Sequence, residues 1–143
     1  DVLLMAAEAA VETNDLATAL DYVNQVRQRA IDSTPVKAAD GSDAANYDIA
    51  LYPNFASQDE ARKAVRFERR LELAMEGHRL FDLRRWDVLV PTMTKYVESE
   101  ARTIPNFGPK FQGAASKHNL FPVPVNAIDQ SSGSLSQNPD WGS

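Results

Sequence analysis

The chain has 143 residues, of which 43% are hydrophobic and 24% charged, and this length suits a single globular domain with a buried core. Its net charge of −5, from 15 basic and 20 acidic residues, argues against a general nucleic-acid-binding protein. No run of about 18 or more apolar residues predicts a membrane-spanning helix. Because cysteine is absent, disulfides within the chain and thiolate metal sites are excluded.

The first 30 residues predict two helices joined by a tight turn. Apolar side chains recur at three- and four-residue spacings over residues 2–13 and again over residues 16–30. Between them lies Thr13-Asn14-Asp15, and short Asx side chains favour turns and helix caps. The short connection makes the helices antiparallel neighbours. The pair resembles a tetratricopeptide-type hairpin, with Ala7 and Ala19 where the two backbones approach closely.

The sequence begins inside this helical pattern, without an initiator Met, a basic leader or a cleavage site. A single tetratricopeptide-like hairpin also needs neighbours to cover its faces. We therefore expect residue 1 to be an internal residue of a longer chain, whose earlier part would hold any signal peptide or lipid anchor.

Residues 31–57 are predicted to form a long loop, since Pro, Gly, Asp, Asn and Ser recur there without helical periodicity. Three aromatic residues of this loop, Tyr47, Tyr52 and Phe55, lie near Asn and Asp residues. Flat aromatic rings stack on the apolar face of a pyranose, while polar side chains bond its hydroxyls. The three are therefore candidate ligand-binding residues. The alternative is that they anchor the loop over the helical core.

A third helix is predicted to start near Ser57, which has capping-box spacing to Glu60, and to run to about Glu76 before Gly77. A further helical segment is expected over residues 78–90, ended by Pro91, and a short helix over residues 92–100. Beyond residue 101 the periodicity disappears, apart from an apolar strip at residues 120–124. The prediction is an all-α fold: a tetratricopeptide-like hairpin, further helices, long irregular loops, and an extended proline-containing tail packed on the helices.

Charged residues are densest in residues 62–86, which hold eight of the 15 basic residues. Glu68, Glu72 and Glu76 are four residues apart, so they would share one helix face and repel one another unless cations lie nearby. Arg69 lies three residues from Glu72, and Arg79 three from Glu76. We expect internal ion pairs with a structural role.

Three other functions could be assigned to this block. A metal site of the kind found in helical bundles needs Glu-x-x-His pairs, whereas Glu76 and His78 are only two residues apart. His78 could act as a general base, yet no nucleophile elbow or glycine-rich phosphate loop accompanies it. A nucleic-acid face is disfavoured because the rest of the chain is acidic. We predict no catalytic residue, no metal and no cofactor.

Three blocks in order resemble the signature of the SusD/RagB family: ERRLELAMEGHRLFDLRRW at residues 68–86, LFPVPVNAID at 120–129 and QNPDW at 137–141. The first 30 residues, which run into VRQRA, resemble the last tetratricopeptide-like hairpin of that family. Asp140 departs from the pattern, which more usually has Gly before the Trp. We expect residues 1–143 to be the C-terminal region of a family member. Its expected parts are the hairpin at 1–30, the loop at 31–57, the helical signature region at 58–100 and the irregular tail at 101–143.

The resemblance implies a non-enzymatic protein at the outer-membrane cell surface, attached only by a lipid anchor upstream of this chain. It implies binding of starch or another polysaccharide or oligosaccharide, and delivery to a SusC-like TonB-dependent transporter. In relatives the glycan contacts lie largely upstream of this region, so no binding residue is carried over. A tetratricopeptide-like scaffold that binds proteins and not sugars is the alternative. A lipid-attachment Cys upstream would favour the first reading, and further 34-residue repeats the second.

Overall fold

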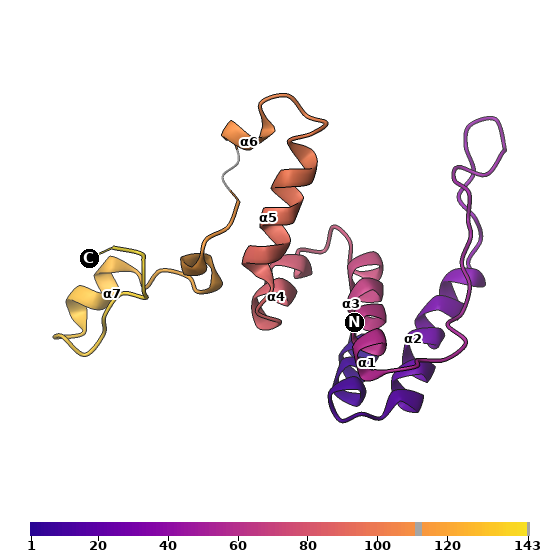
Figure 1. Ribbon diagram of the computed structural model, residues 1–143, viewed down its shortest axis with the longest axis horizontal. Helices are drawn as coiled ribbons and strands as arrows, with labels where there is room; N and C mark the ends of the chain where they lie inside the picture. The colour runs from indigo at the N-terminus through magenta and orange to yellow at the C-terminus, as the bar shows by residue number, and fades with distance from the viewer. Residues whose placement is uncertain (111–112, 143) are drawn as a thin grey trace. The chain divides into compact units, whose positions relative to one another are not determined.

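A computed structural model describes residues 1–110 and 113–142 (Figure 1). All the regular elements in this part of the chain are helices, and the one β-type pairing there is an isolated bridge between Lys37 and Asp43. The prediction of an all-α fold is therefore confirmed. The chain divides into two compact units, residues 1–77 and residues 78–143, and each is described by itself.

The first unit is built from helices α1 (Val2–Glu12), α2 (Leu16–Ile31) and α3 (Gln58–Glu72). The starts of α2 and α3 follow from their caps. Asp15 accepts a hydrogen bond from the backbone N–H of Thr18 at 3.1 Å, and Ser57 accepts one from Glu60 at 3.2 Å. The first two predicted helices are thus confirmed to within one residue at each end. Their likeness to a tetratricopeptide repeat stays a prediction.

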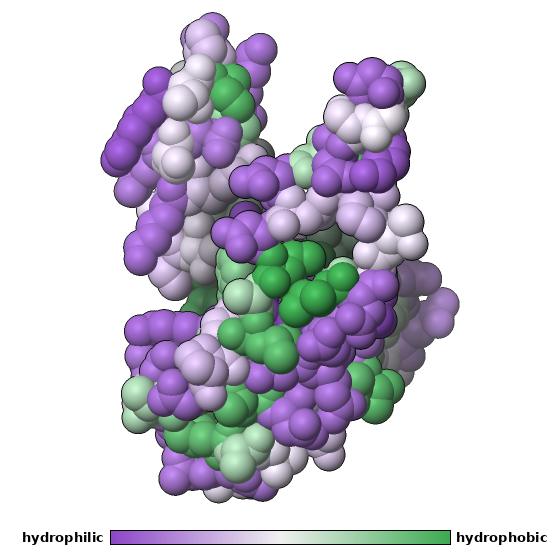
Figure 2. All heavy atoms as spheres, turned by 90° about the vertical axis from the view of Figure 1, so that its right-hand side faces the viewer, coloured by the Kyte–Doolittle hydropathy of each residue, from purple (hydrophilic) through white to green (hydrophobic). Residues whose placement is uncertain are grey.

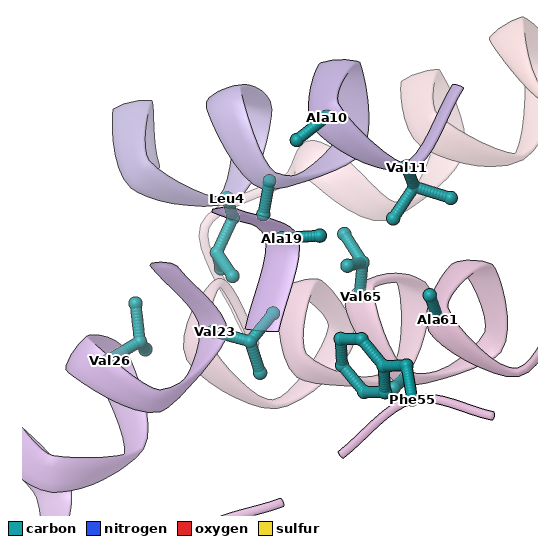
Figure 3. Close-up of a cluster of buried hydrophobic side chains, with 11 residues drawn as sticks. Leu4, Ala10, Val11, Ala19, Val23, Val26, Phe55, Ala61 and Val65 are labelled. Atoms are coloured by element: carbon teal, nitrogen blue, oxygen red, sulfur yellow. The ribbon is translucent and has the colours of Figure 1, made fainter. Parts of the chain in front are cut away.

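The core of this unit lies where the three helices meet (Figure 3). Leu4 and Val11 from α1, Val23 from α2 and Val65 from α3 are fully buried there. Small residues fill the positions of closest approach, listed here by helix: Ala7 and Ala10 on α1, Ala19 on α2, and Ala61 and Ala64 on α3. Burial of this shared apolar stripe is what stabilises helices of this length.

Helix α3 ends four residues earlier than predicted, at Glu72 and not Glu76. The N–H of Leu73 still bonds the carbonyl of Arg69 at 3.1 Å, but Met75 has φ 68° and Gly77 has φ 80°. A left-handed residue cannot continue a right-handed helix. Glycine adopts that conformation readily, whereas Met75 gives no such signal in the sequence, so the earlier end was not predicted.

The loop between α2 and α3 turns back and runs beside α2 before it enters α3 (Figure 1). Asn24 of α2 binds the returning segment of this loop. Its Nδ2 donates to the carbonyl of Tyr52, and its Oδ1 accepts from the N–H of Tyr52, both at 2.9 Å. The amide side chain therefore pairs with the backbone in the way that a neighbouring strand would.

The second unit contains α4 (His78–Arg85), α5 (Leu89–Glu100), α6 (Phe107–Lys110), a 3₁₀ helix, η1 (Ser116–Asn119), and α7 (Val125–Gln130). The predicted segment 78–90 is wrong at its end, because the chain breaks between α4 and α5 at Asp87, where φ is 53°. Pro91 does not end a helix but lies in the first turn of α5. Proline is tolerated there because the N–H groups of a first turn have no acceptor within the helix.

The QNPDW block ties down the proline-containing tail. Gln137 accepts from the N–H of Val123 at 2.7 Å and donates to its carbonyl at 2.9 Å. Asn138 donates to the carbonyl of Phe121 at 2.6 Å. Two of the three signature blocks therefore bond directly to each other.

Arg84 connects this tail to α4. Its Nε donates to the carbonyl of His118 at 2.6 Å, and its guanidinium lies 4.1 Å from the centre of the Phe121 ring. Phe121 remains 59% exposed. A cation stacked on it, in place of a surrounding apolar wall, accounts for that exposure.

Candidate functional site

Arg27 on α2 is bonded to two other parts of the first unit. Its Nη1 lies 2.8 Å from Oε2 of Glu68 on α3, and its Nε donates to the carbonyl of Ala50 at 2.6 Å. Its guanidinium also lies 4.8 Å from the centre of the Tyr52 ring. One side chain thus fixes α2, α3 and the returning loop against each other.

Glu72 of α3 also pairs with a cation from another helix. Nη2 of Arg29 donates to both carboxylate oxygens of Glu72, at 2.7 and 2.6 Å. At the start of the chain Arg69 pairs with Asp1 at 2.8 Å. The expectation of internal ion pairs is confirmed, but the expected partner of Glu72 is wrong. Arg69 bonds Asp1, while the cation for Glu72 comes from α2.

Arg62 of α3 pairs with Glu12 of α1 through two hydrogen bonds, at 2.8 and 2.9 Å. These bonds hold the pKa of Glu12 below its ordinary value, with a smaller Coulombic contribution from Arg62 and an opposing effect of burial. Glu68, Glu72 and Arg62 of α3 therefore help to hold α3 against α2 and α1.

Of the three aromatic candidates, the structure brings Tyr52 and Phe55 together, with ring centres 5.5 Å apart. Phe55 is 8% exposed and belongs to the hydrophobic core (Figure 3), while Tyr52 packs half-buried against that core beneath Arg27. Both rings anchor the loop. A ligand-binding role for these residues stays a prediction, and Tyr47 is the one of the three that is substantially exposed, at 44%.

Tyr47 lines an open pocket of about 450 Å³ between the end of α2 and the loop that follows it. Figure 2 faces the side on which α2 and this loop lie in Figure 1, and apolar side chains gather there among hydrophilic ones. The residues that line it include Arg29, Ile31, Thr34, Val36, Tyr47 and Ile49. Of these six residues, only Tyr47 is among the ligand-binding candidates predicted from the sequence. The β-branched residues on both sides of the loop were a signal in the sequence for the rest of this set except Arg29.

A second open pocket, of about 720 Å³, lies in the second unit beside α7. Val125, Ile128 and Leu135 form its apolar part, and Asp129 and Asp140 are at its edge. No aromatic ring lines it. Over residues 1–110 and 113–142 no group of three or more His, Asp or Glu side chains is placed to hold a metal ion. Among the same residues, no helix has the length and apolar character needed to cross a bilayer.

Comparison with known proteins identifies the family. The model of the SusD family matches residues 1–141, nearly the whole chain, and the chain therefore belongs to the SusD family. The chain is also 39% identical over 90 residues to the SusD-like protein P25 of Formosa agariphila. That alignment covers 63% of this chain and 14% of the relative, so the chain spans a small part of that protein's length.

Proposed function

We propose that this chain is part of a non-catalytic glycan-binding protein at the bacterial cell surface. The observation that carries the proposal is the match of residues 1–141 to the SusD family, whose membership suggests glycan binding there. The complete protein, with any sequence that precedes or follows residues 1–143, would be held on the outer membrane by a lipid anchor. It would deliver a bound polysaccharide or oligosaccharide to a SusC-like TonB-dependent transporter.

Within that protein we assign residues 1–143 to the C-terminal region, because the three signature blocks follow the family's C-terminal order. The contacts of these blocks support a framework role. Glu68 and Glu72 bond to α2, Arg69 bonds Asp1 just before α1, and Gln137 bonds to the proline-containing strip. The principal glycan contacts are therefore proposed to lie outside the signature blocks.

Titration calorimetry of the complete protein against a panel of oligosaccharides tests this proposal. We expect at least one to bind, and we expect the protein to co-purify with a TonB-dependent transporter from detergent-solubilised outer membranes. Protease treatment of intact cells should degrade the protein if it is on the surface. A protein that binds no glycan and accompanies no transporter would contradict the proposal.

A protein-binding scaffold is the second candidate. It is favoured by apolar side chains exposed on two helices of the first unit, Val2 and Met5 on α1 and Phe67 and Leu71 on α3. Under this alternative the protein would bind another protein through these faces and no sugar at all. Transporter co-purification without any glycan binding would favour it, and release of sugar fragments from a bound glycan would instead reveal an enzyme.

A further inference from the structure

The pocket beside Tyr47 has walls that are fixed by hydrogen bonds. One wall is the returning segment of the loop, which contributes Tyr47 and Ile49. Arg27 bonds this segment at Ala50, and Asn24 bonds it at Tyr52. Its outer turn is closed by the bond from the N–H of Ala44 to the carbonyl of Val36 at 2.9 Å. A ligand would therefore meet a pocket that is already formed, and its binding would cost little ordering of the chain.

Tyr47 presents a ring to this pocket. Its hydroxyl donates to the carbonyl of Val36 at 3.4 Å, so the polar end of the side chain is used within the protein. The residue nevertheless stays 44% exposed. A flat, solvent-facing ring of this kind offers a surface on which the apolar C–H face of a pyranose can stack. Ile31, Val36 and Ile49 are also exposed and extend the apolar surface beside it.

Arg29 supplies hydrogen-bond donors at the same pocket. Nη2 of its guanidinium bonds Glu72, whereas Nε and Nη1 make no hydrogen bond to any residue in the described part of the chain. The N–H groups of Nε and Nη1, on separate edges of the guanidinium, can each donate to a sugar hydroxyl. Thr34 adds a hydroxyl to the lining. An apolar side chain of a protein partner would use the walls and leave these donors unsatisfied.

The charge of the pocket indicates an uncharged ligand. Arg29 is the one charged residue among the lining residues, and its charge is already matched by the carboxylate of Glu72. The carboxylate of an acidic sugar would meet a guanidinium whose charge Glu72 already matches. The volume of about 450 Å³ is in the lower part of the usual range for ligand pockets, and the pocket is open to solvent. It therefore suits one or two sugar units of a longer chain that continues outside.

We propose that the pocket formed by Arg29, Ile31, Thr34, Val36, Tyr47 and Ile49 is an accessory subsite for an uncharged pyranose unit of a bound glycan. The inference rests on the proposed function, since it assigns part of the glycan contact to this chain.

The test uses the complete protein with maltoheptaose, cellohexaose, laminarihexaose, xylohexaose and tetragalacturonate as probes in titration calorimetry. For the uncharged probe that binds best, Tyr47→Ala is expected to weaken binding about tenfold, because it removes the stacking ring. Tyr47→Phe keeps the ring and is expected to bind within about twofold of the unsubstituted protein. Tyr96→Ala removes a ring of similar exposure, 46%, that does not line the pocket, and no change in affinity is expected.

Hydrogen exchange gives a second readout that does not depend on a substitution. Saturating the protein with the same probe is expected to slow amide exchange in residues 31–49. Binding that survives Tyr47→Ala and leaves exchange in 31–49 unchanged overturns the subsite and leaves the proposed function intact. Binding of tetragalacturonate alone, if Tyr47→Ala weakens it, overturns the assignment of an uncharged ligand. If no probe binds at all, the proposed function fails and the subsite fails with it.

Discussion

Arg27 and Glu68 form an ion pair between α2 and α3 whose two side chains are only 15% and 7% exposed, with Nη1 and Oε2 2.8 Å apart. The pairs that Glu72, Glu12 and Asp1 form are more open to solvent on at least one side. When one partner of a largely buried pair is removed, the other keeps its desolvation cost without compensation. The bond from Arg27 to Ala50 would be lost at the same time.

We therefore predict that Arg27→Met lowers the free energy of unfolding of the complete protein by about 3 kcal/mol. Methionine retains apolar packing close to that of the arginine stem, so the loss reports mainly on the charged group. Urea denaturation followed by circular dichroism measures it. The matched control is Lys63→Met, which breaks the exposed pair with Asp59 and is expected to cost less than about 1 kcal/mol. Equal losses for the two variants would contradict a special role for Arg27.

Asn24 provides a second prediction, which concerns the returning loop. Asn24→Ala removes both bonds to the backbone of Tyr52 and leaves its N–H and carbonyl without these partners. We expect a loss of about 2 kcal/mol of stability and at least about tenfold faster hydrogen exchange at the Tyr52 amide. Gln25→Ala is the control, because Gln25 bonds only the exposed Asp21 on its own helix. Unchanged protection of Tyr52 in Asn24→Ala would show that other contacts hold the loop.

The helices that could be predicted from the sequence are those with periodic apolar residues and local caps. The caps Asp15 and Ser57 act within three residues, and so they can be read from a short stretch. The end of α3 and the break after α4 could not be read in this way. They depend on left-handed backbone at Met75 and Asp87, and neither residue type requires that conformation.

In the candidate site too, local sequence predicted some features, while others depend on residues far away in the chain. Tyr47, Tyr52 and Phe55 were found from composition, but their different exposures depend on the path by which the loop returns to α2. That path is set by Asn24 and Arg27, which lie more than 20 residues earlier in the sequence. The spacing of glutamates on α3 likewise indicated that cations were needed, yet it could not indicate that they come from α2.

Glu12 provides a prediction about pH. Because hydrogen bonds from Arg62 lower its pKa in the folded state, Glu12 contributes stability that is fully present above its ordinary pKa of 4.5. The contribution is lost as the pH falls through the lower folded-state pKa. Glu12→Gln should therefore reduce stability at pH 7, and the difference from the unsubstituted protein should disappear well below pH 4.5. Urea denaturation at a series of pH values measures this.

Arg62→Gln is the companion variant for that experiment, since it removes the other half of the pair. The same acid-dependent component of stability should be much smaller in it, since only the weaker Coulombic effect of Arg66 on Glu12 remains, and 1 M salt should shrink the component in the unsubstituted protein. An unaltered pH profile in Arg62→Gln would mean that another cation lowers the pKa of Glu12.

Ala19 tests how closely α1 and α2 approach. Its side chain is fully buried between helices, among Leu4, Val23 and Val65 in the core cluster, and a larger residue there has no free space. Ala19→Leu is predicted to destabilise the protein by about 2–3 kcal/mol through overpacking. Ala9→Leu makes the same substitution at an exposed position of α1 and should change stability by less than about 0.5 kcal/mol, since both residues are good helix formers. If Ala19→Leu were tolerated as well as Ala9→Leu, the two helices could not be packed at the distance that small residues at this position imply.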